Sequence, residues 1–220
     1  MNYIFKPNGD KLEFVGDFES LYENEDDPWE QSAGSGSMAI YYEYSRKRLA
    51  EQLKKINPNS LLEVGCGLGY TTKNIQESLP GCDVTGMDIS RTAIKKAAKL
   101  FPSLDFISGD IGCTNFNSEI KYDVVVLNQM LWYILESFSD TIKNCFSILN
   151  PSGSVIISHA FLRTPQKYGK DICDGFDGLV SYLNDHKFNI EHSHLDDASS
   201  FVHNDGLVVF KKHDSQKEMG

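Results

Sequence analysis

The sequence lacks the features of an exported, membrane-spanning or zinc-binding protein. No N-terminal stretch combines a basic start, an apolar core and a small-residue cleavage site, so we expect no secretory signal. The longest apolar run, residues 124–135, is interrupted by Asn128 and Gln129 and is too short to span a bilayer. The five cysteines are scattered and none forms a C-x-x-C pair. The sequence therefore predicts reduced thiols, a cytoplasmic location and no metal site.

Basic residues are also scarce. The 21 lysines and arginines are outnumbered by 31 aspartates and glutamates, which gives a formal net charge of −10. A protein with this balance repels phosphate through its overall field, so we expect neither nucleic acid nor a membrane surface as a partner, although a local basic patch could still exist. The acidic residues concentrate in residues 1–30, where only Lys6 and Lys11 are basic, and we interpret most of them as a solvated arm. No oligomeric state is favoured.

A loop-forming stretch, residues 31–37, separates an acidic and aromatic lead segment from the rest of the chain. After it, apolar residues fall at helical spacing from near Met38 until Asn57-Pro58 ends the pattern. We therefore divide the chain into a lead segment (residues 1–37), a cofactor-binding domain (residues 38–212) and a polar tail (residues 213–220).

Strand-like and helix-like patterns alternate from residue 60 onwards. Strands are expected at residues 61–64, 82–87, 104–108, 122–127, 154–158, 188–194 and 207–211, and helices at residues 71–79, 90–100, 138–149 and 176–183. Such alternation predicts an α/β fold with a mostly parallel sheet and helices on both faces. Ligands of these sheets bind beyond the carboxyl ends of the strands. The functional residues should therefore follow Val64, Met87, Ser108 and Leu127.

A glycine-rich loop, Glu63-Val-Gly-Cys-Gly-Leu-Gly69, lies where the first of these strands turns into a helix. Glycines suit a tight turn that a ligand approaches closely. Asp88 ends the second strand about 20 residues further on, where a carboxylate hydrogen-bonds ribose hydroxyls. A dinucleotide fingerprint would require glycine at position 70, which is Tyr70.

These motifs occur in order with three others: Ser108-Gly-Asp-Ile111, Tyr122-Asp-Val-Val-Val-Leu127 and Leu149-Asn-Pro-Ser-Gly-Ser-Val155. Over residues 38–160 the sequence resembles class I methyltransferases that depend on S-adenosyl-L-methionine (SAM). The resemblance implies their Rossmann-like fold with a seven-stranded, mostly parallel sheet. It also implies an enzyme that uses SAM and releases S-adenosyl-L-homocysteine.

The resemblance implies a cofactor site formed by Glu63, Gly65, Gly67, Gly69, Asp88, Ile89, Asp110, Ile111 and Asn128. In that site the glycines shape the loop under the methionine part, which Glu63 orients. Asp88 holds the ribose hydroxyls and Ile89 packs on the adenine. Asp110 and Ile111 line the adenine edge, and Asn128 lies by the sulfonium. Taken alone, Asp110 could equally cap a turn.

The lead segment resembles the N-terminal part of the NodS-type family, which N-methylates amino sugars. The resemblance rests on residues 14–22, on Asp27-Pro-Trp29 and on residues 41–46. It implies a lid in which Trp29, Tyr42 and Arg46 touch SAM, with Arg46 or Tyr42 meeting its carboxylate. Trp29 could also be a hydrophobic clip, and Arg46 could be solvated. The resemblance favours a sugar or sugar-nucleotide acceptor in glycan or natural-product biosynthesis.

Candidates for the acceptor side are Tyr22, Trp132, Tyr133, His159 and Tyr168. Among them we choose His159 and Tyr133 as catalytic candidates. His159 ends a predicted strand, where a general base for a hydroxyl acceptor would be well placed. The aromatic residues could equally belong to the core, and His159 could be structural. The pattern allows both N- and O-methylation.

Three other functions compete with this interpretation. An NAD(P)-dependent oxidoreductase uses similar loops, but Tyr70 and the absence of a Tyr-x-x-x-Lys pair weigh against it. A methyltransferase acting on a macromolecule would share the same cofactor motifs. A SAM-binding protein without catalysis would share them too.

Overall fold

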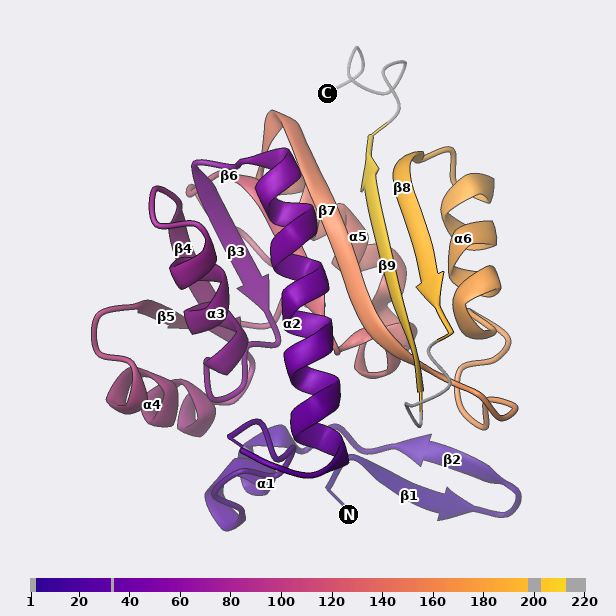
Figure 1. Ribbon diagram of the computed structural model, residues 1–220. Coiled ribbons are helices and arrows are strands. Elements are labelled where there is room, and N and C mark those ends of the chain that lie inside the picture. The colour runs from indigo at the N-terminus through magenta and orange to yellow at the C-terminus, as the bar shows by residue number, and fades with distance from the viewer. Residues whose placement is uncertain (1–2, 33, 198–202, 213–220) are drawn as a thin grey trace. The chain divides into compact units, whose positions relative to one another are not determined.

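The computed structural model describes residues 3–32, 34–197 and 203–212 (Figure 1). The predicted polar tail, residues 213–220, lies outside the described residues. The chain divides into two compact units, Met1–Asp110 and Ile111–Gly220, and each is described by itself. Across the described part of the chain, no helix has the length and apolar character needed to cross a membrane.

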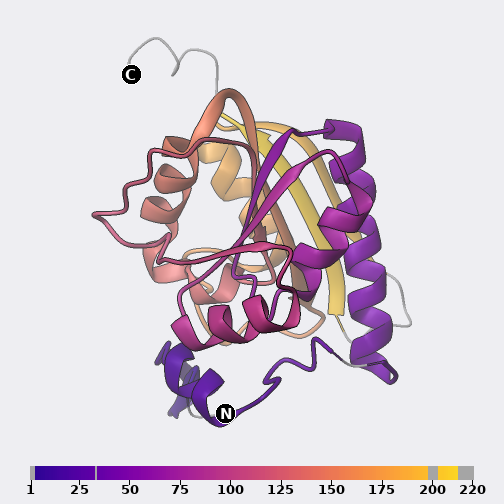
Figure 2. The ribbon, with the colours of Figure 1, turned by 90° about the vertical axis from the view of Figure 1, so that its left-hand side faces the viewer.

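The lead segment of the first unit contains three elements that the sequence analysis did not predict. Strands β1 (Phe5–Asn8) and β2 (Lys11–Phe14) pair as an antiparallel hairpin, and helix α1 (Phe18–Asn24) follows. Asp17 caps α1, because its Oδ1 accepts a hydrogen bond of 3.0 Å from the backbone N–H of Ser20. Figure 2 shows α1 beside helix α4 (Arg91–Leu100) of the same unit.

Helix α2 (Ser37–Ile56) confirms the helix predicted from near Met38. Its buried side chains Tyr41, Ser45, Leu49 and Leu53 are spaced four residues apart and therefore share one face. Asn57 ends the helix in the left-handed region at φ 52°, ahead of Pro58, as the Asn-Pro pair predicted.

Three parallel strands form the sheet of the first unit in the order β5-β4-β3. They are β3 (Ser60–Val64), β4 (Asp83–Asp88) and β5 (Asp105–Ser108), with α3 (Tyr70–Ser78) between β3 and β4 and α4 between β4 and β5. Ser90 caps α4 by accepting a hydrogen bond of 3.0 Å from the N–H of Ala93. The strands and helices predicted here are confirmed to within one or two residues.

The second unit holds strands β6 (Tyr122–Asn128), β7 (Leu149–Leu162), β8 (Asn189–Asp196) and β9 (His203–Lys211) in the order β6-β7-β9-β8. Strand β7 is parallel to β6, and β9 is antiparallel to both β7 and β8. Two short 3₁₀ turns, η1 (Leu131–Tyr133) and η2 (Leu135–Ser137), precede helix α5 (Phe138–Ser147), and α6 (Gly175–Asp185) precedes β8. The central residues of β6 are fully buried, as its valine run predicted.

Strand β7 is much longer than residues 154–158, the range predicted for it. It begins at Leu149, opposite Tyr122, and a register shift absorbs Asn150 to Gly153 before Ser154 pairs with Val124. At its other end, residues 159–162 pair with residues 203–206 of β9. Antiparallel pairing with a later strand, which local periodicity does not reveal, extends both β7 and β9. The prediction of a Rossmann-like α/β fold with seven mostly parallel strands is confirmed.

Candidate functional site

The glycine loop after β3 adopts a backbone that favours glycine at each predicted position. Gly65, Gly67 and Gly69 have φ values of 75°, 55° and 80°. The loop is tied to β4, because the N–H of Gly65 donates to the carbonyl of Met87 at 2.8 Å. A Cβ on Gly67 would lie 2.6 Å from the hydroxyl of Tyr22. The loop therefore has no room for a side chain at Gly67.

The carboxylate of Asp88 lies at the carboxyl end of β4 and is 7% exposed. Its Oδ2 accepts from the N–H of Gly67 and its Oδ1 from the N–H of Ser90, both at 2.9 Å. Burial raises the pKa of Asp88, and these hydrogen bonds oppose the shift. An ionised carboxylate has about four acceptor positions, so two backbone N–H groups leave capacity for hydroxyls.

Ile89 and Asp110 follow the ends of the neighbouring strands β4 and β5. Asp88 pairs with Ser108 of β5, and the N–H of Gly109 donates to the carbonyl of Asp88 at 3.0 Å. Ile89 is 49% exposed although it is a large apolar residue, and Asp110 is also exposed. An exposed aliphatic side chain next to a buried carboxylate suits a ligand with a flat apolar ring beside a polyol.

Glu63 of β3 is buried and accepts a hydrogen bond of 2.6 Å from Thr72 Oγ1. Its negative charge also acts on Arg46 of α2. Burial lowers the pKa of Arg46, and the charge of Glu63 is the largest effect that opposes this shift. The residue predicted to orient the methionine part is therefore electrostatically coupled to a residue predicted to meet the methionine carboxylate.

Trp29, Tyr42 and Arg46 lie together in the first unit, although Trp29 and Arg46 are 17 positions apart in the sequence. The Tyr42 hydroxyl donates to the carbonyl of Trp29 at 2.8 Å. The Arg46 guanidinium carbon lies 4.9 Å from the centroid of the Tyr42 ring. Burial raises the pKa of Tyr42 to about 12, so the hydroxyl stays protonated at neutral pH. Contact of these three residues with a cofactor stays a prediction.

The structure bears differently on the two alternatives for this region, in which Trp29 is a hydrophobic clip and Arg46 is solvated. Trp29 packs against a buried cluster of Tyr22, Leu68 and Ala93, which is the arrangement of a hydrophobic clip. Tyr22, an acceptor candidate, is 2% exposed within that cluster. Arg46 is not simply solvated, because its guanidinium donates to Thr71 Oγ1 at 3.2 Å and to the carbonyl of Gln31 at 3.1 Å.

Sequence reasoning missed two lead-segment residues that contact this region. Gln31 Oε1 accepts from the N–H of Leu68, in the glycine loop, at 3.0 Å. The Glu19 carboxylate accepts from the hydroxyls of Ser90 and Thr92, each at 2.7 Å. Glu19 is therefore an exception among the acidic residues of the lead segment, most of which are expected to be solvated. No local pattern distinguishes Glu19 from its acidic neighbours, because its partners lie about 70 residues away.

In the second unit, His159 is 3% exposed and surrounded by aromatic rings. The centroids of Trp132 and Phe161 lie 4.8 Å and 5.3 Å from its ring, both edge to face. Neither ring nitrogen of His159 has a hydrogen-bond partner among the described residues. Burial lowers the pKa of His159 to about 3, so the ring is neutral at pH 7.

Asn128 and Gln129 lie at the carboxyl end of β6, next to the segment that carries His159. Asn128 pairs with Ser158, and Gln129 has an unusual positive φ of 55°. The N–H of Gln129 donates to the carbonyl of Ser158 at 2.8 Å, and its Oε1 accepts from the N–H of Ala160 at 2.9 Å. Gln129, which was not predicted as a site residue, therefore fixes the backbone on both sides of His159.

The remaining candidates of the second unit lie in different surroundings. Tyr133 is half-buried at the end of η1. Tyr168 donates to Glu136 Oε1 at 3.2 Å. Ile111 is 2% exposed, and its carbonyl accepts from Asn144 Nδ2 at 2.8 Å. The side chain of Ile111 therefore belongs to the core of this unit, and its contact with adenine stays a prediction.

Comparison with known proteins identifies the class of the domain. Residues 62–155 match a family model described as a methyltransferase domain. The predicted resemblance to class I methyltransferases is thus confirmed for the part of the chain that carries the glycine loop, Asp88 and β6. The fold agrees: NodS, an N-methyltransferase from Bradyrhizobium japonicum WM9 solved with S-adenosyl-L-homocysteine, aligns with a TM-score of 0.63. That alignment has 18% identity and covers 88% of this chain and 97% of NodS.

Two curated relatives carry specific names. A malonyl-[acyl-carrier protein] O-methyltransferase of Halalkalibacterium halodurans is 30% identical over 109 residues, which are 47% of this chain and 40% of that protein. A trans-aconitate 2-methyltransferase of Escherichia coli O157:H7 is 26% identical over 125 residues, which are 55% of this chain and 48% of that protein. The matched regions thus span less than half the length of either relative.

Proposed function

We propose that this chain is a SAM-dependent methyltransferase that acts on a small molecule. One observation carries the proposal: the glycine loop and the buried Asp88 carboxylate are joined by a hydrogen bond of 2.9 Å. Both lie inside the region that matches the methyltransferase domain. A dinucleotide-dependent oxidoreductase fits less well, because Tyr70 stands where its third glycine belongs.

The residues of the first unit suit the cofactor. When bound, SAM supplies a methyl group already activated by its sulfonium. Asp88 would accept hydrogen bonds from the ribose hydroxyls with its remaining lone pairs. The exposed side chain of Ile89 would cover one face of the adenine. Asp110 would accept from the exocyclic amine. The loop of Gly65, Gly67 and Gly69 would admit the methionine part close to its backbone.

Arg46 or Tyr42 would hold the carboxylate of the cofactor, and Glu63 would orient its methionine part. Guanidinium and carboxylate form strong charge-assisted hydrogen bonds. The negative charge of Glu63 already acts on Arg46. Hydrogen bonds from Arg46 to Thr71 and Gln31 keep the guanidinium in place. We propose that Trp29 and Gln31 belong to a lid in the lead segment. Asn128 is proposed as a further cofactor-binding residue.

His159 and Tyr133 are proposed for the acceptor side. Methyl transfer requires mainly that the acceptor is aligned with the donor, because proximity can lower a barrier by about 7–11 kcal/mol. The neutral ring of His159 has two nitrogens without partners in the described structure. A hydroxyl or amine acceptor would supply one of them with a hydrogen bond and would thereby be oriented. With a pKa of about 3, His159 is a weak base, which suits orientation more than proton removal.

A sugar or sugar-nucleotide is the acceptor class that we propose first. Its support is the resemblance of the lead segment to the NodS-type family. The relatives include proteins named as O-methyltransferases and a structure named as an N-methyltransferase, so N- and O-transfer both fit. A macromolecular acceptor such as RNA is disfavoured by the net charge of −10.

An acceptor screen tests this proposal. Purified protein and SAM are incubated with amino sugars, nucleotide sugars and small carboxylic acids, and release of S-adenosyl-L-homocysteine is followed for each. We expect turnover with a sugar and a loss of at least about tenfold in His159→Gln, because a lost oriented hydrogen bond costs about 1.4 kcal/mol or more. Turnover on carboxylic acids alone would contradict the sugar class. Cofactor binding without any turnover would indicate a non-catalytic SAM-binding protein.

A further inference from the structure

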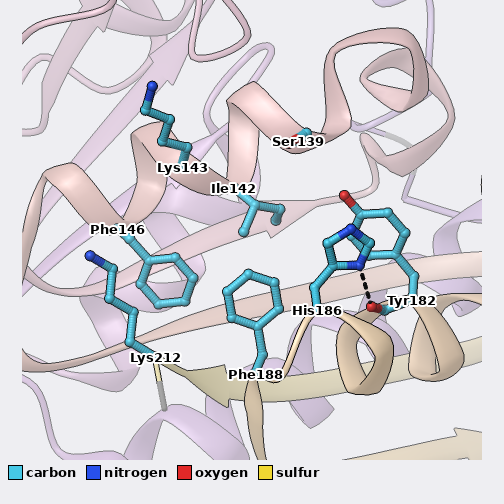
Figure 3. Close-up of a pocket in the computed structure, with 8 residues that line it drawn as sticks. All are labelled: Ser139, Ile142, Lys143, Phe146, Tyr182, His186, Phe188 and Lys212. Atoms are coloured by element: carbon cyan, nitrogen blue, oxygen red, sulfur yellow. Dashed lines mark hydrogen bonds between the residues drawn. The ribbon is translucent and has the colours of Figure 1, made fainter. Parts of the chain in front are cut away.

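A groove outside the residues discussed so far opens in the second unit, between α5, the end of α6, Phe188 just before β8 and Lys212 just after β9 (Figure 3). We call it the α5–α6 groove. Its volume is about 230 Å³. Ile142 of α5 lines it and is 2% exposed, and partly exposed aromatic side chains surround Ile142.

The walls of the α5–α6 groove are formed by two pairs of stacked rings. Phe146 and Phe188 stack with centroids 5.3 Å apart and an angle of 21° between their planes. Tyr182 and His186 stack at 4.0 Å and 23°. His186 is held by its Nδ1, which lies 2.8 Å from the carbonyl oxygen of Tyr182. Figure 3 shows Ile142 between the two pairs. Such a space suits a flat ring.

The charge of the lining contrasts with that of the chain. Among the residues that the structure describes, Lys143 and Lys212 line the groove and no carboxylate does, whereas the whole protein has a net charge of −10. The Lys212 Nζ lies 5.8 Å from the centroid of the Phe146 ring. Within the described ranges, neither lysine forms an ion pair. Two lysine side chains that line an apolar space and form no ion pair among the described residues are complementary to a ligand that combines a ring with an anionic group.

The α5–α6 groove lies away from the edge of the sheet that carries the acceptor candidates. Where β9 pairs with β7, Leu207 lies opposite Ser158 and Phe210 lies opposite Val155. Lys212 follows Phe210 by two positions, so it lies beyond the amino-terminal side of this stretch of β7. Asn128 and His159 lie at the other end, where β6 finishes opposite Ser158. A ligand in the groove would therefore occupy a second site.

We propose that the α5–α6 groove binds a small aromatic anion, with the ring between the two stacked pairs and a carboxylate or phosphate near Lys143 and Lys212. A cavity of about 150 Å³ admits benzene, whereas drug-sized ligands need about 300–1,000 Å³. At about 230 Å³ the groove therefore accommodates one ring with a small substituent. An extended acidic peptide would place only a single side chain there.

Ligand-detected NMR with benzoate, phenyl phosphate and neutral benzyl alcohol tests this proposal and separates carboxylate from phosphate recognition. We expect millimolar or tighter binding of at least one anion. Lys143→Gln and Lys212→Gln should each weaken it at least about threefold, as should raising the salt concentration, because partly exposed charges are screened. Lys55→Gln, which removes an exposed lysine of α2, is the matched control and should change nothing.

Phe188→Leu separates the ring from the charge, because it keeps an apolar side chain and removes one stacking face. The variant should bind the anion more weakly, and its melting temperature should show that it stays folded. The proposal is overturned if neither anion binds, if the lysine variants bind as well as the parent protein, or if benzyl alcohol binds as tightly as the anions. The last result would indicate an ordinary apolar crevice.

Discussion

At the scale of single residues, the candidate cofactor site depends on positions that tolerate no other side chain. Gly67 combines a φ of 55° with a space already filled by the Tyr22 hydroxyl. The same short loop also delivers the Gly67 N–H to Asp88. One residue therefore determines both the shape of the loop and the orientation of the carboxylate.

Gly67→Ala should lower the free energy of unfolding by about 1–2 kcal/mol for the left-handed backbone alone, and by more through the contact with Tyr22. Urea denaturation measures the effect. Tyr22→Phe removes the hydroxyl, so the double variant should recover part of the loss. Gly81→Ala is the matched control, because its Cβ would meet nothing within 4 Å. Equal stability of the Gly67 and Gly81 variants would contradict the geometry described for the loop.

His159 makes the stability of the protein depend on pH. Its pKa in the folded state, about 3, lies below the ordinary value of 6.5, because burial disfavours the charged ring. Between these values the unfolded chain binds a proton that the folded chain does not. The stabilising effect is therefore complete above about pH 6.5 and is lost as the pH falls toward 3.

From pH 7 to pH 5, wild-type protein should lose about 2 kcal/mol more unfolding free energy than His159→Phe, at about 1.4 kcal/mol per unit below pH 6.5. Phenylalanine keeps the aromatic packing and removes the titration. His203, whose pKa burial also lowers, is present in both proteins and cancels in the comparison. Parallel pH profiles for the two proteins would show that His159 is accessible to solvent or protonated in the folded state.

At the scale of elements, hydrogen bonds from α4 hold α1 near both of its ends. Glu19 accepts from Ser90 and Thr92 at the start of α4, and the pKa of Glu19 is lowered by these hydrogen bonds. Lys96 donates from α4 to the carbonyls of Tyr22 and Glu25 at 2.8 Å and 2.9 Å. The short α1 depends on these contacts, because a helix of this length is not stable alone.

Glu19→Gln should therefore loosen α1. We expect several-fold faster amide hydrogen exchange in residues 18–24, measured by mass spectrometry, because an amide oxygen is a weaker acceptor than a carboxylate. Lowering the pH through the range in which Glu19 becomes protonated should have the same effect in the parent protein. Glu23→Gln, an exposed change in the same helix, should leave the exchange rate unaltered. Unchanged exchange in the Glu19 variant would mean that the Lys96 hydrogen bonds and the apolar packing of Tyr22 hold the helix without Glu19.

The elements that local sequence predicted well are those with strong periodicity and clear ends. The helix near Met38 has apolar residues four positions apart and an Asn-Pro end, and β6 is an uninterrupted valine run. The β1–β2 hairpin has only four residues in each strand, and α1 has seven, too few for a pattern to emerge. The extension of β7 depends on pairing with β9, which lies about 45 residues later.

The difference between local patterns and distant contacts also explains which site residues the sequence predicts. Asp88 and the glycines belong to motifs with fixed local spacing, and their backbone geometry agrees with the expectation. The side chains of Glu19, Gln31 and Gln129 accept hydrogen bonds from partners 31 to 73 positions away, so neither their type nor their immediate neighbours reveal them. Burial of Ile111 in the core of the second unit was equally outside the reach of a motif.

At the scale of the whole molecule, charge and domain content restrict the function. The net charge of −10 disfavours an extended phosphate-binding surface, and residues 62–155 match the methyltransferase domain. We therefore expect this domain to bind a SAM-type cofactor through the glycine loop and Asp88. Methyl transfer to any acceptor requires this binding.

Calorimetric titration with S-adenosyl-L-homocysteine, with NAD and NADP in parallel, is the most direct test. We predict micromolar or tighter binding of S-adenosyl-L-homocysteine and none of either dinucleotide. Asp88→Asn should weaken binding at least about tenfold, since hydrogen bonds to a charged group are worth about 1.5–3 kcal/mol. Asp83→Asn, an exposed change at the start of the same strand, should bind normally. Binding of NAD or NADP instead would exclude a SAM-type cofactor, and undiminished affinity in Asp88→Asn would exclude Asp88 as a cofactor-binding residue.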